Sequence, residues 1–432
     1  MKKFAYVGCL GFIAVITTEF GVIGILPQIA EYYKITIDRA GMLLSVFALV
    51  IALTGPFMTL FVSGFDRKKV MLLGILMFLI TGLISFLSPP FWLLMLVRIL
   101  PAFLQPVYIA TALSVAVSKG NERNKNELMS IVFSGVAIAM VSTVPFATWV
   151  ASRLSWEYSF MVQTIVSMIA LLGIYIFLPN MPVVAKKSYG SQLNILKQPT
   201  FIISTAMNFF MISAWFSTYS YFAEYLNKAK GLDSMTVSYM LFIFGLIGVI
   251  ANKVAGRLLN KNVTKTTVFF LSGTILIPFL LYFSGNNIIV LTLIIALWGF
   301  MYSPSFLNAS TYMISSVPNS LEFANSLATS FGNLGVTVGT TIGGWIIATK
   351  GVEFTPWLTM LFGILALMMI LLRNYLEKHI TDQTVKKKQV TLITKNLKYL
   401  SVITYQRFFT FFYCKEKVYE LNEIVRMGNR FR

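Results

Sequence analysis

The stretch FAYVGCLGFIAVITTEFGVIGIL, residues 4–26, decides the fold class of this chain. It is an apolar run long enough to cross a bilayer as a helix, which takes about 20 residues. One ionisable residue, Glu19, interrupts the run. Because a charge inside a bilayer is costly unless it faces a partner or a wet cavity, Glu19 is a candidate functional residue.

The composition of the whole chain agrees with this first run. Of its 432 residues, 57% are hydrophobic and only 12% are charged, whereas soluble domains are roughly 25% charged. The mean hydropathy is +0.76. The net charge of +19 comes mostly from basic residues between apolar runs, where they set orientation rather than bind nucleic acid. The sequence predicts an integral membrane protein with the lipid bilayer, and no nucleic acid, as its partner.

Apolar runs of membrane-spanning length recur along the chain, separated by Pro, Gly, Asn and charged residues. The first run is preceded by Lys2 and Lys3 but extends past the roughly 7–15 residues of a signal-peptide core, so it predicts a span. The sequence predicts twelve transmembrane helices, at 4–27, 40–63, 70–88, 91–117, 128–151, 158–178, 199–222, 235–256, 266–284, 287–314, 323–348 and 354–372.

The basic residues of the connections are unevenly distributed between the two sides of the membrane. With the N-terminus inside, fifteen Lys or Arg fall in cytoplasmic connections and six in external ones. The positive-inside rule therefore predicts that both termini are cytoplasmic.

The longest internal connection, residues 179–198, separates six spans from six. Small residues spaced by four mark the fifth span from Gly135 to Ala151, and Gly335, Gly339 and Gly343 mark the eleventh, 200 positions later. Such stripes let helices approach closely, and their matched places predict two related halves. The expected domains are a six-helix bundle at 1–180, a basic linker at 181–198, a second six-helix bundle at 199–374 and a basic cytoplasmic tail at 375–432.

Several motifs share the pattern of one transporter family. They are TEFGVIGILPQI at 18–29, GMLLS at 41–45, GFDRKK at 64–69, Arg98 within the fourth span and VPFATW at 144–149. With the six-plus-six spans, they resemble the major facilitator superfamily, in the drug/proton antiporter branch of bacterial sugar-efflux and chloramphenicol-efflux-like permeases. The sequence departs from the pattern at Val144, where a glycine is usual, and after Arg98, where Pro101, Gln105 and Pro106 replace the glycine-rich stretch that often follows.

The resemblance implies an all-α major facilitator fold in a bacterial inner membrane. It also implies export of sugars or small amphiphilic drugs in exchange for protons, with no cofactor and with a monomer as the expected state. By the same resemblance, Gly64, Asp66 and Arg67 form the gating loop motif, and Gly135 and Pro145 belong to the antiporter motif.

Glu19 and Arg98 are the expected proton-coupling residues. Glu19 precedes the external end of its span by about as many residues as Arg98 follows the external start of the fourth span, so the two lie at similar depth. In one interpretation Glu19 takes up a proton and releases it when Arg98 or a cationic substrate approaches. In the other, the two residues form a permanent structural bridge that removes two buried charges.

Six further residues are candidates for the substrate cavity: Gln105, Asn208, Trp215, Tyr219, Tyr302 and Asn308. Gln105 lies seven residues after Arg98 and so on the same helix face. The others fall on stripes of the seventh and tenth spans. For each of them, packing or hydrogen bonding between helices is the alternative interpretation.

The sequence gives no sign of an enzyme. A single histidine, His379, and two cysteines, Cys9 and Cys414, provide neither a metal cluster nor a catalytic set. The alternatives to an exporter are a solute importer or uniporter, with a structural Glu19, and a non-transporting sensor whose output is the tail. The tail is expected to be an interfacial or disordered basic segment that touches anionic lipid.

Overall fold

The computed structural model describes residues 2–62, 65–118, 125–181, 195–285, 287–317 and 321–428. Within these ranges the regular structure is helical and no strand occurs. The chain divides into two compact units, Met1–Leu372 and Arg373–Arg432. Twelve helical segments of the described residues are long and apolar enough to cross a membrane. The predicted all-α fold with twelve spans is confirmed.

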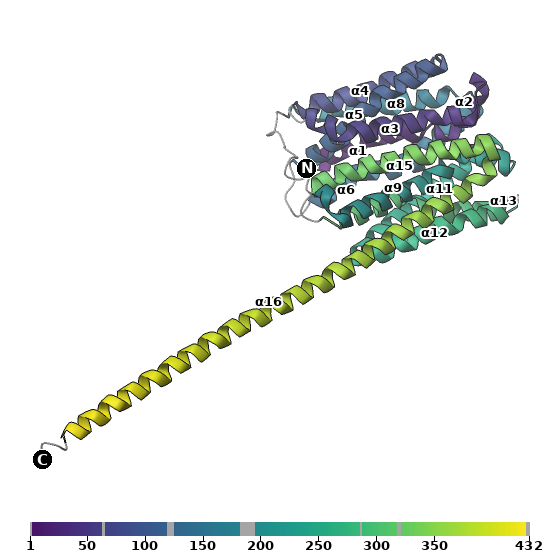
Figure 1. Cartoon of the computed structure of the whole chain (residues 1–432). Coiled ribbons are helices and arrows are strands. Elements are labelled where there is room, and N and C mark those ends of the chain that lie inside the picture. Colours follow the sequence, from purple (N-terminus) through teal and green to yellow (C-terminus); the bar gives the residue numbers. More distant parts are fainter. Residues whose placement is uncertain are drawn as a thin grey trace. The chain divides into compact units, whose positions relative to one another are not determined.

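The helices of the first six spans are drawn in purple to blue-teal in Figure 1. They are α1 (Lys2–Phe20), α2 (Leu26–Tyr33), α3 (Ile37–Val62), α4 (Arg67–Phe86), α5 (Phe91–Val117), α6 (Lys125–Val141), α7 (Thr143–Arg153) and α8 (Tyr158–Phe177), with the 3-10 turn η1 (Ile23–Ile25) between α1 and α2.

The remaining helices follow in teal, green and yellow. They are α9 (Pro199–Tyr219), α10 (Phe222–Glu224), α11 (Ser234–Lys261), α12 (Val263–Phe283), α13 (Ile288–Tyr302), α14 (Ser305–Ile314), α15 (Leu321–Lys350) and α16 (Thr355–Gly428), with the π-turn η3 (Tyr225–Ala229) and the 3-10 turn η4 (Val352–Phe354).

Several spans are broken helices, and the sequence explains most of the breaks. The first span breaks after Phe20, where Gly21 leaves the helix, and the seventh breaks at the corresponding place, after Tyr219. The tenth span breaks at Pro304, because proline lacks the N–H that a continuous helix requires. Broken helices place free backbone groups at membrane depth, which is tolerated only inside protein or beside a cavity.

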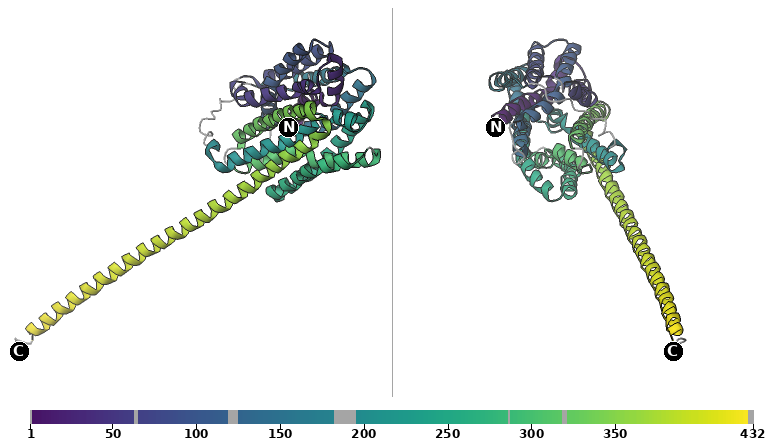
Figure 2. Two further views of the ribbon diagram at one scale, coloured as in Figure 1. Left: turned by 45° about the vertical axis from the view of Figure 1, so that its right-hand side comes forward. Right: turned by 90° about the vertical axis from the view of Figure 1, so that its left-hand side faces the viewer.

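The helices of the first unit pack mainly within each half of the chain. In the first half, α1 packs on α6 and α8, and α4 packs on α5 and α8. In the second half, α15 packs on α9, and α13 packs on α11 and α12. Figure 2 (right) looks roughly along these helices and shows the purple and blue ones grouped on one side and the green ones on the other.

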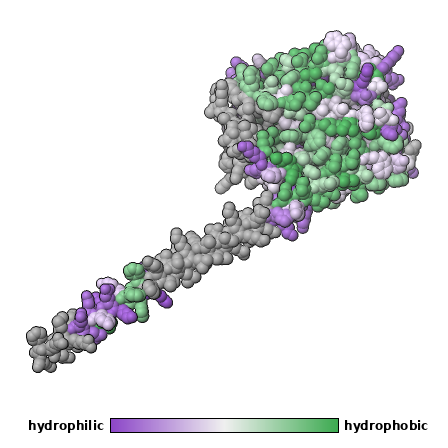
Figure 3. All heavy atoms as spheres, in the orientation of Figure 1, coloured by the Kyte–Doolittle hydropathy of each residue, from purple (hydrophilic) through white to green (hydrophobic). Residues whose placement is uncertain are grey.

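Three helix pairs make the main contacts between the halves. The largest is α3 with α15, and the two smaller ones are α11 with α6 and α11 with α7. Figure 1 shows α3 and α15 side by side along much of their length. The visible face of this unit carries a broad apolar band, as expected for a surface that meets lipid (Figure 3).

The second unit is the continuation of α16 beyond Leu372. Its first turn contains an ion pair in which Arg373 Nε donates to Glu377 Oε1 at 2.6 Å. The helix extends to Gly428. The tail is expected to be either an interfacial or a disordered segment. In the structure it is helical rather than disordered.

Candidate transport site

Glu19 lies one residue before the end of α1, and its side chain is buried, with 3% of its surface exposed. One contact satisfies its carboxylate: Gln105 Nε2, from α5, donates to Glu19 Oε2 at 2.5 Å. Gln105 is equally buried. The predicted cavity residue Gln105 and the predicted coupling residue Glu19 are therefore brought together.

Arg98, also on α5, is 1% exposed and is held by backbone carbonyls. Its Nη2 donates to the carbonyl of Thr18 at 3.0 Å, and its Nε donates to that of Leu43 at 3.5 Å. The guanidinium also lies over the Phe47 ring, 5.5 Å from the centroid. Arg98 thus links α5 to α1 and α3.

The structure places Arg98 beside Glu19 without pairing the two charges directly. The carbonyl that Arg98 binds belongs to Thr18, the residue before Glu19. In the described part of the chain, no salt bridge joins the Glu19 carboxylate to the Arg98 guanidinium. The geometry is a shared site in which Gln105, rather than Arg98, contacts the carboxylate.

The local sequence of α5 explains why this site forms. Pro101 and Pro106 lie inside the helix, and each removes one backbone N–H. Pro101 leaves the carbonyl of Val97 without a helical donor, and the hydroxyl of Thr81 donates to it at 3.0 Å. This bond fixes α4 against α5 directly next to Arg98.

Two polar atoms of this site have no protein partner among the described residues, Arg98 Nη1 and Gln105 Oε1. Buried polar atoms are normally hydrogen-bonded to protein or water. One donor and one acceptor therefore remain available within a site that already contains a carboxylate, and this combination suits water or a hydroxyl-bearing solute.

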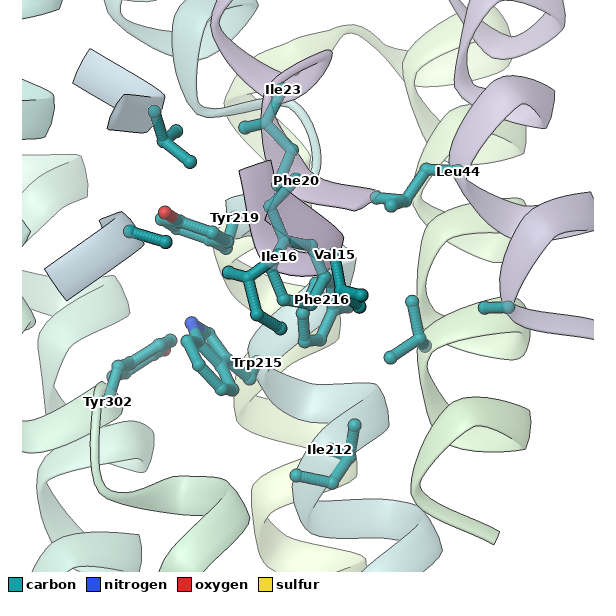
Figure 4. Close-up of a cluster of buried hydrophobic side chains, with 14 of the residues drawn as sticks. Val15, Ile16, Phe20, Ile23, Leu44, Ile212, Trp215, Phe216, Tyr219 and Tyr302 are labelled. Carbon is teal, nitrogen blue, oxygen red and sulfur yellow. The ribbon is translucent and has the colours of Figure 1, made fainter. Parts of the chain in front are cut away.

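The second half contributes aromatic rings. The rings of Trp215 and Tyr219 on α9 are tilted against each other with centroids 5.6 Å apart, and Trp215 meets Phe306 of α14 edge-on at 5.2 Å. Figure 4 shows Trp215, Phe216 and Tyr219 gathered against Ile16 and Phe20 of α1. The rings of Phe20 and Phe216 are 5.5 Å apart. Phe20 follows Glu19 directly, so the aromatic cluster lies next to the acid site.

The other predicted cavity residues are more engaged in helix packing. Asn208 Nδ2 donates to the carbonyl of Ala328 at 2.9 Å, and Tyr302 donates to the carbonyl of Thr274 at 3.2 Å. Asn308 Nδ2 donates to Pro304 at 3.0 Å, and its Oδ1 has no partner in the described chain. Trp215 Nε1 is also without one. Trp215 and Asn308 therefore retain unused polar atoms.

The predicted packing glycines lie where backbones come close. A Cβ added at Gly339 would be 2.5 Å from the carbonyl oxygen of Ser213, and Gly335 and Gly343 meet α9 in the same way. In the first half, a Cβ at Gly135 would be 2.7 Å from the carbonyl oxygen of Cys9. Pro145 is buried on α7. These glycines allow α15 to approach α9, and α6 to approach α1.

The loop motif ties the start of the third span to the segment that follows the sixth span. Asp66 caps α4 by accepting from Lys69 N at 3.1 Å, and its other oxygen accepts from Met181 N at 3.0 Å. The backbone N–H of Arg67 donates to the carbonyl of Met181 at 3.2 Å. Gly64 lies outside the described residues.

Tyr221 is a residue that the sequence reasoning missed. It follows the break in the seventh span and donates to the carbonyl of Thr340 on α15 at 2.9 Å. A Cβ at Gly41 or at Gly344 would lie 2.1 or 2.4 Å from its hydroxyl oxygen. Tyr221 thus fills the space between α3 and α15, which closes the halves at this end. The adjacent glycines Gly343 and Gly344 were the available signal.

No group of three or more His, Cys, Asp or Glu side chains in the described ranges is arranged to hold a metal ion. The site is therefore described by one carboxylate, one guanidinium, one amide and a set of rings.

Comparison with known proteins identifies the family. The model of the Major Facilitator Superfamily matches residues 8–322. A probable sugar efflux transporter of Pasteurella multocida is 22% identical over 86% of this chain and 92% of its own length. The inner membrane transport protein YdhP of Escherichia coli O157:H7 is 26% identical over 84% of this chain and 93% of its own. The chain belongs to the major facilitator superfamily.

Solved structures give the same fold. The human organic anion transporter MFSD10 (TETRAN) has a TM-score of 0.67 and 14% identity, covering 86% of this chain and 99% of its own. A mutant of the nucleoside transporter NupG has the same TM-score, identity and coverage. The protein is a multi-pass membrane transporter, similar to bacterial inner membrane transporters and to proteins named as sugar efflux transporters, and its family is one of transporters rather than enzymes.

Proposed function

We propose that the protein exports sugars or small amphiphilic molecules in exchange for protons by alternating access, with Glu19 as the proton-binding group. The observation that supports this most is the state of the Glu19 carboxylate. It is buried in the first span, it accepts from the neutral amide of Gln105, and no salt bridge in the described chain fixes its charge.

The difference between an amide partner and a guanidinium partner matters for proton exchange. A carboxylate in a salt bridge is held ionised by its cationic partner. A carboxylate bonded to a neutral amide can be protonated without leaving an uncompensated buried cation. Arg98 is already satisfied in part by two carbonyls, so its charge is compensated when Glu19 becomes neutral. This arrangement favours titration over permanent pairing.

The aromatic rings of the second half supply the substrate-facing surface in this proposal. Trp215 and Phe306 provide flat apolar faces, and Trp215 Nε1 and Asn308 Oδ1 provide a donor and an acceptor. Rings suit either a sugar face or an amphiphile, and the polar atoms fix its orientation. The relatives named as sugar efflux transporters support the first of these classes.

The proposal includes a cytoplasmic location for both termini and a bacterial inner membrane. The excess of basic residues in the connections on the side of the N-terminus supports the orientation. A monomer is sufficient, because a single chain supplies both the acid site and the aromatic cluster. Asp66 and Arg67 are proposed to control opening at the end where they join α4 to Met181.

The test is transport by the purified protein in proteoliposomes, with an imposed pH gradient and a panel of sugars and amphiphiles. The wild type is expected to move at least one compound against its gradient and to release protons when that compound is added. Glu19→Gln is expected to lose pH-driven accumulation while it retains downhill exchange. Glu31→Gln is the matched control, because Glu31 is an exposed acid on α2.

Two results would contradict the proposal. If Glu19→Gln accumulated substrate as the wild type does, the carboxylate would be structural and the importer or uniporter would be favoured. If the wild type moved no compound and deletion of residues 376–432 abolished a cellular response, the sensor would be favoured.

A further inference from the structure

The helix of the second unit contains an aromatic segment that the transport proposal does not use. Seven of the fifteen residues from Tyr405 to Tyr419 are aromatic. Phe411 is 69% exposed and Tyr413 is 65% exposed. Figure 3 shows a green, apolar patch on this part of the helix, adjacent to purple, hydrophilic side chains. Exposed aromatic surface of this extent marks an interaction site.

We infer that residues 405–419 form a membrane-surface helix that binds the anionic lipid headgroups of the leaflet next to the end of the twelfth span. The inference concerns the tail alone and does not depend on the direction or coupling of transport.

The spacing of the aromatic residues supports a helix that lies along a surface. Phe409, Phe412 and Tyr413 are exposed and follow the i, i+3, i+4 spacing, which places them along one face. Arg407 occupies the opposite side. Aromatic residues are favoured at the depth of lipid headgroups, where a ring can be buried while polar groups stay hydrated.

The charge of the tail selects the kind of lipid. After Arg373 the chain has 12 Lys or Arg and 5 Asp or Glu. Arg407, Lys415 and Lys417 are exposed within or beside the aromatic segment. Basic residues next to an aromatic face are attracted to anionic lipid, and each one strengthens binding to the surface about 5-fold.

The chain also keeps the segment near the membrane. As a helix, the connection from Leu372 to Tyr405 is ~50 Å long, since each residue adds about 1.5 Å. The transmembrane unit therefore holds the segment at high local concentration beside one leaflet. Two solved transporters with this fold align over 99% of their own length with 86% of this chain. The remaining part of this chain is long enough to include the tail.

Cys414 allows a direct test in the full-length protein. It is exposed in the middle of the segment, whereas Cys9 is buried in α1. A nitroxide attached to Cys414 in a Cys9→Ala background reports collisions with dissolved oxygen and with a water-soluble nickel reagent. The protein is placed in nanodiscs of phosphatidylcholine alone or of phosphatidylcholine with phosphatidylglycerol.

We expect the label to be shielded from the nickel reagent and accessible to oxygen in discs that contain phosphatidylglycerol, and accessible to the nickel reagent in phosphatidylcholine alone. Lys415→Gln with Lys417→Gln should weaken the partition about 25-fold, from two lysines at about 5-fold each. Phe409→Ser with Phe412→Ser should abolish the shielding, because both residues lie on the aromatic face. Lys34→Gln with Lys350→Gln is the charge-matched control, because both lysines are exposed in the first unit.

The inference is overturned if the label collides equally with the nickel reagent in both kinds of disc. It is also overturned if shielding is accompanied by dipolar coupling between two labels, since the aromatic segment would then pair with a second copy of the chain. High salt provides an independent check, because it should reduce the effect of phosphatidylglycerol.

Discussion

The two halves of the transmembrane unit contribute different chemistry to the same region. The first half supplies the charges, with Gln105 bonded to the Glu19 carboxylate and Arg98 bonded to the neighbouring Thr18 carbonyl. The second half supplies rings, with Trp215 at the centre of three aromatic contacts. In the proposed function, this division separates proton binding in the first half from substrate binding in the second half.

This division predicts that variants of the first half change coupling and stability together, whereas variants of the second half change substrate affinity. The contact between Phe20 and Phe216 is where the two regions meet. Variants in each half therefore test whether the two roles are separate.

Arg98→Leu is expected to have the largest effect. It removes the buried cation beside Glu19 and both hydrogen bonds to backbone carbonyls. A hydrogen bond to a charged group contributes about 1.5–3 kcal/mol, so the loss of both should cost about 3–6 kcal/mol. Thermal unfolding of the purified protein should show a large fall in Tm. The double variant with Glu19→Gln should recover part of that loss, and a double variant no more stable than Arg98→Leu alone would show that the two charges are independent.

Gln105→Met should have the next largest effect. It keeps the side-chain volume but removes the donor to Glu19, and a hydrogen bond to a charged group contributes about 1.5–3 kcal/mol. We expect a lower Tm and slower pH-driven transport. Gln163→Met is the matched control, because the amide of Gln163 is buried without a partner among the described residues. Equal losses in both variants would mean that the bond to Glu19 contributes nothing specific.

Trp215→Phe tests the second half. It keeps a ring in the cluster and removes the unused indole N–H. If this N–H binds substrate, KM should rise about 2–10-fold, the value of one neutral hydrogen bond, with little change in the maximal rate. Trp92→Phe on the exposed surface is the control. A loss of proton coupling in Trp215→Phe would contradict the separation of roles between the halves.

Asp233→Ala should have the smallest effect and calibrates the others. Asp233 is an exposed cap of α11, and its hydrogen bond with Thr236 lowers the pKa of its carboxyl. Loss of such a cap costs about 1 kcal/mol. Because the folded pKa is lowered, this stabilisation is present above the ordinary value of about 3.9 and is lost as pH falls through the lowered pKa. Unfolding of the wild type and the variant at neutral and acidic pH measures this stabilisation. A change in transport would show that Asp233→Ala cannot serve as a reference variant without functional effect.

The sequence was sufficient for the fold class because its signals are local. Runs of apolar residues gave all twelve spans, since a bilayer requires length and hydrophobicity within each segment. It also indicated which glycines pack, because a small residue every fourth position marks a close helix contact. The breaks within spans were less accessible: the tenth was predicted as one helix and is divided at Pro304.

By itself, the sequence determined that a buried acid lies in the first span of a twelve-helix transporter and that Arg98 lies at a similar depth. Only the tertiary structure decided that Gln105 contacts the carboxylate, that Arg98 binds the neighbouring carbonyl, and that Tyr221 fills the space between Gly41 and Gly344. Depth along a helix follows from counting residues, whereas the partner of a side chain depends on the rotation and approach of helices distant in sequence.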